Sequence, residues 1–182
     1  MVAMELKRIH HVAYRCNDAK ETVDFYREAL DMRFLLAFAE NEVPSTGAPD
    51  PYMHVFLDAG MGNVLAFFEL PNAPPMGKDP ATPDWVQHIA FEVPTREELD
   101  AAKVRLDAMG LDVLGPVDHG LFDSIYFFDP NGHRLELACN KGTADDIARA
   151  ESVAEAMLEE WHRTRRAPRH AAWLHTKTGS AE

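Results

Sequence analysis

The sequence predicts an α+β protein made of two tandem βαβββ modules that form a shared cup, followed by a C-terminal helix. The first observation behind this prediction is an internal repeat. The passages IHHVAY and VQHIAF lie 77 residues apart, and each carries a histidine, His11 or His88, at the matching point. The second is a helix-start motif that follows seven residues after each histidine. The third is a proline-rich stretch at residues 71–84 between the two copies.

The first module is expected over residues 1–72. Alternation of side chains predicts a strand at 6–16, in which His11 points into the cup and His10 toward the helix side. The motif Asp18-x-x-Glu21 then opens a helix over residues 18–30. The remaining pattern predicts strands at 32–38, 52–57 and 63–70, with a loop rich in proline and glycine at 40–51.

The second module is expected over residues 85–141, after a linker at 73–84. It repeats the order of the first, with a strand at 86–93, a helix at 95–109 and strands at 111–117, 122–128 and 133–139. The sequence Asp129-Pro-Asn-Gly marks a turn between the last two strands. His88 is expected to point into the cup, because Ile89 and Phe91 form the apolar face that packs on the helix.

Residues 142–182 fall outside the repeat. Apolar residues at three- and four-residue steps predict an amphipathic helix at 143–166. This helix is expected to cap the domain or to contact a second subunit, and we expect a homodimer.

Composition narrows the class of partner. The net charge of −12 argues against nucleic acid or an anionic membrane as the main partner. The chain has no apolar run of 18 residues and no charged-then-apolar leader, so we expect a cytoplasmic protein without a membrane span. Cys16 and Cys139 lie in apolar strands and are expected to be buried, reduced thiols.

The repeated histidines are candidate metal ligands. Glu136 lies among apolar residues of the last predicted strand, where a carboxylate needs a partner or a metal ion. Two imidazoles and one carboxylate with open coordination positions form the facial triad that suits Fe(II) or Mn(II). Glu69 is the counterpart of Glu136 in the first module. It is either a fourth ligand or a solvated residue at the end of its strand.

Residues 6–140 resemble the vicinal oxygen chelate superfamily, which groups glyoxalase, bleomycin resistance and type I extradiol dioxygenase-like proteins. The motifs that carry the resemblance are His11-Val-Ala before the Asp18 helix, Phe25-Tyr26-x-x-x-Leu30, Gln87-His88-Ile-Ala and Tyr126-Phe-Phe-Asp-Pro-Asn-Gly-His-Arg-Leu-Glu136. The resemblance implies paired modules around a divalent metal ion that a substrate chelates through neighbouring oxygens. Carried over by position, the ligands are His11, His88 and Glu136, with Glu69 as the open fourth.

The segment from Asp118 to Tyr126 resembles the stretch before the last metal ligand in type I extradiol ring-cleaving dioxygenases. That resemblance implies that His119 and Tyr126 lie beside a bound catechol, with His119 passing protons near neutral pH. It favours an Fe(II)-dependent dioxygenase that uses O₂ to open a small aromatic diol. Two departures weigh against it: Asn63 stands where that class has a catalytic histidine, and the extra non-metal domain of the larger enzymes is absent.

Three alternatives stay open. A glyoxalase I-like lyase or isomerase holds Ni(II) or Zn(II) with four protein ligands, and Glu69 as a ligand would favour it. A thiol transferase of the fosfomycin-resistance kind shares Ser124-x-Tyr126 and the Asp-Pro-Asn-Gly turn, although the acidic balance offers no obvious phosphonate pocket. A resistance protein that binds an aromatic drug without catalysis would have no use for three converging ligands.

Overall fold

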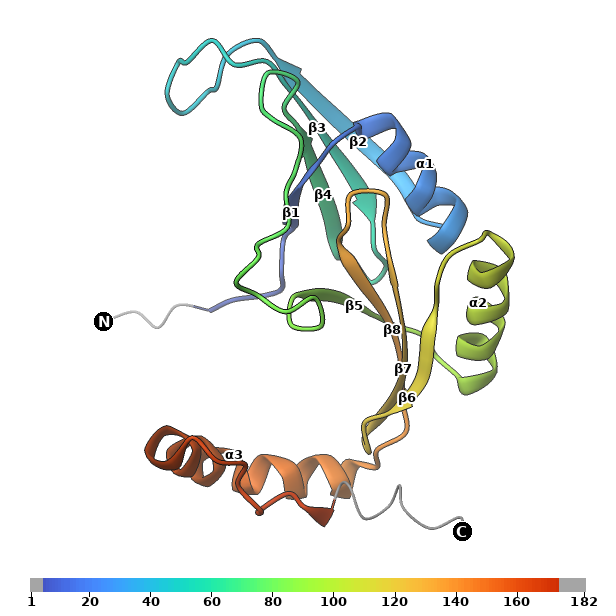
Figure 1. Ribbon diagram of the computed structural model, residues 1–182, viewed down its shortest axis with the longest axis vertical. Coiled ribbons are helices and arrows are strands. Elements are labelled where there is room, and N and C mark those ends of the chain that lie inside the picture. The colour runs from blue at the N-terminus through green and yellow to red at the C-terminus, as the bar shows by residue number, and fades with distance from the viewer. Residues whose placement is uncertain (1–4, 174–182) are drawn as a thin grey trace. The chain divides into compact units, whose positions relative to one another are not determined.

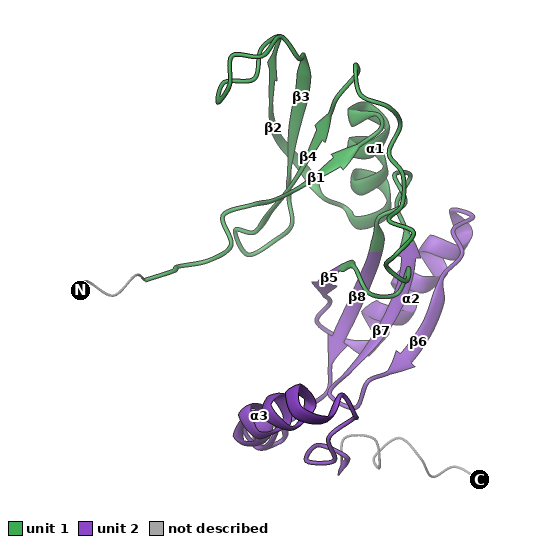
Figure 2. Ribbon diagram, turned by 60° about the vertical axis from the view of Figure 1, so that its left-hand side comes forward, with its two compact units in different colours: residues 1–88, 128–134 green, residues 89–127, 135–182 purple. Residues whose placement is uncertain are grey.

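The computed structural model describes residues 5–173 of the chain (Figure 1). It divides into two compact units, which are coloured separately in Figure 2. Unit 1 comprises Met1–His88 together with Phe128–Arg134, and unit 2 comprises Ile89–Phe127 together with Leu135–Glu182. Among residues 5–173, no helix has the length and hydropathy needed to cross a membrane.

Unit 1 contains the first βαβββ module. Its elements are β1 (Val12–Cys16), α1 (Ala19–Leu30), β2 (Arg33–Glu40), β3 (Tyr52–Asp58) and β4 (Val64–Glu69). The strands form one sheet in the order β1-β4-β3-β2, in which β1 is parallel to β4 and the other pairs are antiparallel. The helix begins at Asp18, whose side chain accepts a hydrogen bond from Glu21 N, as the sequence predicts.

The two faces of the unit 1 sheet differ. Val55 and Leu57 of β3 and Phe67 of β4 are buried, and Phe67 packs against Tyr26 of α1 with ring centroids 5.1 Å apart. These residues form the core beneath α1. Residues of the alternate set, such as His54 and Phe56, lie on the face that α1 does not cover, because successive side chains of a strand point to opposite sides.

The second module repeats this architecture. Its elements are β5 (His88–Glu92), α2 (Arg96–Ala108), β6 (Leu114–Asp118), β7 (Phe122–Phe128) and β8 (Arg134–Asn140), and the sheet order is β5-β8-β7-β6. Thr95 and Glu98 form the reciprocal capping box that the sequence predicts at the start of α2. The helix α3 (Ala144–Thr164) follows, and the α+β class with tandem βαβββ modules and a C-terminal helix is confirmed.

Three predicted strands begin at least two residues later than expected. The predicted strand at 6–16 begins at Val12, because β1 pairs with β4 and the ladder starts at Val12 opposite Leu65. The predicted strand at 86–93 begins at His88, since Val86 N bonds to Pro83 O in a preceding turn. The predicted strand at 111–117 begins at Leu114, because Leu111 N bonds back to Leu106 O and closes α2.

The turn between β7 and β8 belongs to unit 1, where its polar side chains contact α1 and β1. Tyr26 OH donates to Asp129 Oδ2 at 3.2 Å. Burial of the phenol, and next the negative charge of Asp129, raise the pKa of Tyr26 well above its ordinary value. His133 Nε2 lies 2.7 Å from Arg15 O. Asn131 Oδ1 accepts from Asn17 N at 2.8 Å, and Asn131 Nδ2 bonds to Thr22 Oγ1 and Asp129 Oδ2, each at 3.0 Å.

Asn131→Ala is expected to destabilise the protein by about 1–2 kcal/mol, because Asn17 N–H and the Thr22 hydroxyl would each lose a hydrogen-bond partner. Urea denaturation should show a lower midpoint with an unchanged slope. Asn140→Ala is the control, since within residues 5–173 the Asn140 amide bonds only the exposed Glu92 carboxylate. Equal midpoints for the two variants would contradict the prediction.

Both cysteines are free and buried, as the sequence predicts. Burial raises the pKa of the Cys16 thiol to about 11, and the hydrogen bond with Thr22 offsets only part of that effect. Cys16 is therefore a neutral, structural thiol at neutral pH.

Candidate functional site

The structure divides the predicted site residues between the two units: unit 1 holds His11, Glu69 and His88, and unit 2 holds His119, Tyr126 and Glu136. Among residues 5–173, no three histidine, cysteine, aspartate or glutamate side chains are grouped to hold a metal ion. The ligand set therefore stays a prediction, and each part of it is described within its own unit.

In unit 2, three predicted site residues form one hydrogen-bonded chain. Tyr126 OH donates to Glu136 Oε1 at 3.2 Å and lies 2.7 Å from His119 Nε2. A phenol has one proton, so when it is donated to Glu136, His119 Nε2 must carry a proton and donate to the Tyr126 oxygen. In this arrangement His119 donates a hydrogen bond to Tyr126, and Tyr126 donates one to the Glu136 carboxylate.

The Glu136 carboxylate is deeply buried, with only 3% of the residue exposed. Ser124, which is fully buried, donates its hydroxyl to the same Oε1 at 2.5 Å. A buried carboxylate requires such donors, and carboxylates that hold metal ions are in turn hydrogen-bonded by neighbouring groups. Glu136 therefore has the surroundings of a metal ligand. Sequence reasoning assigned Ser124 only to an alternative function and missed this contact.

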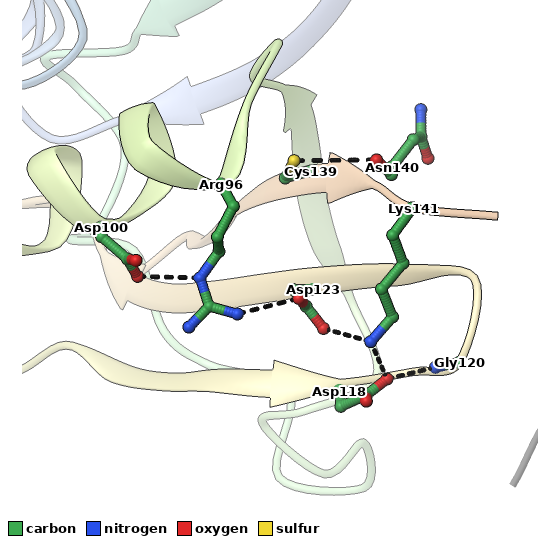
Figure 3. Close-up of polar contacts among 8 residues, drawn as sticks. All are labelled: Arg96, Asp100, Asp118, Gly120, Asp123, Cys139, Asn140 and Lys141. Carbon is green, nitrogen blue, oxygen red and sulfur yellow. Dashed lines mark hydrogen bonds and ion pairs between the residues drawn. The ribbon is translucent and has the colours of Figure 1, made fainter. Parts of the chain in front are cut away.

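His119 lies in the turn between β6 and β7, which an ion-pair network holds in place (Figure 3). Lys141 Nζ bonds Asp118 and, at 2.7 Å, Asp123. Arg96 binds the other side of Asp123 at 2.9 Å. The backbone N–H of Lys141 also donates to Leu121 O at 2.9 Å. The network fastens the turn to the end of β8 and the start of α2.

The charge on Asp118 is stabilised by the same network. The Lys141 ammonium and the Gly120 N–H hold the pKa of the Asp118 carboxyl below its ordinary value. His119 N donates to Phe122 O at 2.9 Å and completes the turn. No sequence pattern pointed to Lys141. Its partners Asp118 and Asp123 lie on β6 and β7, and they are recognisable only once these strands are paired with β8.

In unit 1, His11 lies just before β1 on the face of the sheet that α1 does not cover. Its ring centroid is 5.9 Å from that of Phe56 and 6.3 Å from that of His54, both on β3. His10 Nδ1 lies 2.8 Å from His11 Nδ1. His54 is a candidate that sequence reasoning missed, although the alternation of β3 could have placed it on this face.

His88 is exposed at the start of β5, while its neighbours Ile89 and Phe91 are more covered, as the predicted alternation requires. His88 Nδ1 lies 3.1 Å from Val86 O. When Nδ1 carries the proton of this hydrogen bond, Nε2 carries the lone pair. This is the arrangement in which backbone carbonyls fix the tautomer of metal-binding histidines.

Glu69 has a structural contact of its own. Its Oε2 accepts a hydrogen bond from Ala19 N at 2.7 Å, at the start of α1, where the helix dipole favours a negative charge. Glu69 is in alternation with Leu65 and Phe67, the residues of β4 that are buried beneath α1. His54 and Phe68 belong to the other face, so Glu69 serves the helix face in this structure. Its role as a fourth ligand stays a prediction.

Comparison with known proteins identifies a family. Residues 8–137 match the model of the Glyoxalase/Bleomycin resistance protein/Dioxygenase superfamily. MhqA of Bacillus subtilis, named as a ring-cleaving dioxygenase, is 27% identical over 141 residues, which cover 76% of this chain and 42% of MhqA. The metallothiol transferase FosB of Bacillus licheniformis is 30% identical over 131 residues, which cover 71% of this chain and 73% of FosB.

A third relative is biphenyl-2,3-diol 1,2-dioxygenase 3 of Rhodococcus globerulus, which is 31% identical over 100 residues, 55% of this chain and 50% of that enzyme. The chain therefore spans half or less of the two dioxygenases. Solved structures share the fold. A glyoxylase/bleomycin resistance protein/dioxygenase domain from Frankia sp. EAN1pec has a TM-score of 0.59 at 19% identity and covers 75% of this chain and 100% of its own.

A mutant of the fosfomycin resistance protein FosX from Listeria monocytogenes, complexed with Mn(II) and 1S,2S-dihydroxypropylphosphonic acid, has a TM-score of 0.53 at 18% identity. The match covers 79% of this chain and 99% of that structure.

Proposed function

Because the chain belongs to the Glyoxalase/Bleomycin resistance protein/Dioxygenase superfamily, whose members bind divalent metal ions, we propose that it is a metal-dependent dioxygenase that opens the ring of a small aromatic diol with O₂. The observation that carries this proposal is the hydrogen-bonded chain from His119 through Tyr126 to Glu136. It links the two residues expected beside the substrate to the carboxylate expected to hold the metal. The two dioxygenase relatives support the same reaction class.

The proposed metal ligands are His11, His88 and Glu136, which the repeated sequence places at matching points of the two modules. These side chains supply the two imidazoles and one carboxylate of a facial triad. The hydroxyl groups that bond Glu136, and the contact of His88 with Val86 O, are typical of groups that orient metal ligands. We take Fe(II) as the metal, with Mn(II), Ni(II) and Zn(II) as alternatives. Bound iron(II) would supply coordination positions for the diol and for O₂. Glu69 is not included among these ligands, because its carboxylate bonds the first turn of α1.

Within this proposal, His119 and Tyr126 handle the oxygens of the substrate. Tyr126, 9% exposed, is held by hydrogen bonds on both sides and can orient a diol oxygen. An imidazole can act as a general base and then as a general acid, so His119 can accept the proton of a diol hydroxyl on Nδ1 and return it to the ring-opened product. The ion-pair network around Lys141 keeps the His119 turn in place for this transfer.

Ser124→Ala is expected to weaken metal binding by about 10- to 100-fold, the usual cost of losing a partner of a metal ligand. The reason is that Glu136 Oε1 would lose its shorter hydrogen bond while the carboxylate stays buried. Competition with a chelator of known affinity measures the change. Ser152→Ala is the matched control, because Ser152 is exposed on α3 and its hydroxyl bonds, in the described part of the chain, only to Arg149 O. Equal affinities in the two variants would rule out an orienting role for Ser124.

A second candidate function is transfer of a thiol to a fosfomycin-like epoxide. It is favoured by the FosB relative, of which this chain covers 73%, and by the buried Ser124 and Tyr126 that the sequence pattern shares with that class. The net charge of −12 opposes the binding of an anionic phosphonate.

One experiment separates these functions. The protein is purified without oxygen, its metal is identified by elemental analysis, and each reaction is then assayed. Oxygen consumption with catechol or 2,3-dihydroxybiphenyl, together with a ring-opened product, would support the dioxygenase. Loss of thiol from L-cysteine with fosfomycin would support the transferase, and turnover of the methylglyoxal–glutathione adduct would support a glyoxalase-type lyase. Binding of an aromatic compound without metal or turnover would support a resistance protein.

A further inference from the structure

A row of aromatic rings crosses the face of the unit 1 sheet that α1 does not cover. The ring centroids are 5.7 Å apart for Phe38 and Phe56, 4.1 Å for Phe56 and His54, 3.6 Å for His54 and Phe68, and 5.6 Å for Phe68 and Tyr52. The row follows from strand register, because Phe38 of β2 and Phe68 of β4 both pair with His54 of β3. His54 therefore occupies the centre of the row, stacked on Phe68 with an interplanar angle of 17°.

Packing alone does not explain why the central residue of this row is a histidine. Its Nε2 is shielded from solvent, and no atom of residues 5–173 forms a hydrogen bond with it. An unpaired buried nitrogen costs free energy, and a phenylalanine would fill the same position without that cost. A ligand that offered a partner to this nitrogen would recover the lost hydrogen bond. The side chain is thus suited to binding rather than to stabilising the sheet.

The surroundings of His54 indicate what kind of group it would bind. The rings of Phe56 and Phe68 lie against His54, with centroids 4.1 and 3.6 Å from its own, so its surroundings are apolar and favour an uncharged partner. A neutral imidazole has one donor and one acceptor nitrogen and matches a hydroxyl group better than a carboxylate. The ring centroid of His11, a proposed metal ligand, is 6.3 Å away.

We propose that His54 is a substrate-binding residue that hydrogen-bonds a hydroxyl of the aromatic diol while the ring of the diol lies against Phe56 and Phe68. This inference rests on the proposed function, since it names a further residue for the same substrate. It assigns specificity for uncharged, hydroxylated rings to the helix-free face of unit 1. Offset stacking on aromatic side chains supplies the remaining contact area.

The test is the affinity for catechol, measured by calorimetry without oxygen on the protein carrying its own metal. His54→Phe keeps a ring in the row and removes both nitrogens, so we expect binding to weaken about 5- to 10-fold, as for the loss of one hydrogen bond. His54→Gln retains a donor and an acceptor and should recover part of the affinity. Tyr52→Phe is the control, because it removes a polar atom from the same strand and the same row.

An unchanged affinity in His54→Phe overturns the inference, and so does loss of metal from both His54→Phe and His54→Gln, since His54 would then act on the metal site. If His54→Phe does not fold, His54→Leu takes its place with the same expected loss. Binding of catechol by the unaltered protein without oxygen consumption contradicts the dioxygenase proposal but leaves the comparison of affinities valid. The two proposals can therefore fail separately.

Discussion

His88→Ala is expected to remove the bound metal ion and, with it, all turnover. The proposed site has three protein ligands, and the loss of one imidazole leaves a single histidine and a carboxylate for a divalent ion. The contact of His88 Nδ1 with Val86 O supports this assignment, because it leaves the lone pair on Nε2. Elemental analysis of the anaerobically purified variant measures the effect. We expect less than a tenth of the metal content of the unaltered protein.

The variant should fold normally, because His88 is exposed and its side chain is not part of the core. Circular dichroism checks this expectation. His170→Ala is the matched control: His170 is also an exposed histidine, its Nε2 lies 2.8 Å from Glu160 Oε2 of α3, and its loss should leave the metal content unchanged. Full metal content in folded His88→Ala protein would remove the central support for the proposed site.

Features that depend on local sequence were predicted most accurately. The starts of α1, α2 and α3 lie at Asp18, Thr95 and Thr143, and each of these side chains accepts a hydrogen bond from the backbone three residues later. Such caps need only neighbouring residues, so the sequence contains the whole signal. The repeat of modules was equally visible, since each copy carries the same strand and helix order.

Strand limits and side-chain networks were less accessible, because they depend on residues far away in the sequence. The first strand begins at Val12 rather than at residue 6, since its partner β4 starts only at Val64. The unpaired nitrogen of His54 becomes apparent only when β2, β3 and β4 are placed in register. The contact of Glu69 with Ala19 likewise requires the end of β4 to meet the start of α1.

In the candidate site too, features of single strands could be predicted from the sequence, whereas contacts between strands could not. Alternation along the first strand indicated His11 rather than His10 of the first repeat, and the spacing of Tyr126 and Glu136 on neighbouring strands placed both in one region. The sequence did not reveal that Ser124 and Tyr126 both donate to one carboxylate oxygen, because that depends on how β7 pairs with β8. Resemblance supplied the expected roles, and the hydrogen bonds give them a physical basis within unit 2.

His119→Ala is expected to keep the metal ion and to lower turnover by about 100- to 10,000-fold, the usual contribution of a positioned acid–base group. His119 bonds Tyr126, and Tyr126 in turn bonds Glu136, so the substitution removes no direct contact with that proposed ligand. The metal content should therefore equal that of the unaltered protein. Steady-state oxygen consumption with catechol, at saturating substrate, measures the loss.

Two companion variants separate proton transfer from a loss of packing. His119→Gln keeps a hydrogen-bond donor for the Tyr126 oxygen but cannot take up a proton near neutral pH, so it should be about as inactive as His119→Ala. Tyr126→Phe keeps His119 and removes the hydroxyl that joins it to Glu136, and it should impair both turnover and metal affinity. If His119→Gln retained nearly full activity, His119 would only orient Tyr126, and the proton would have to leave the diol by another route.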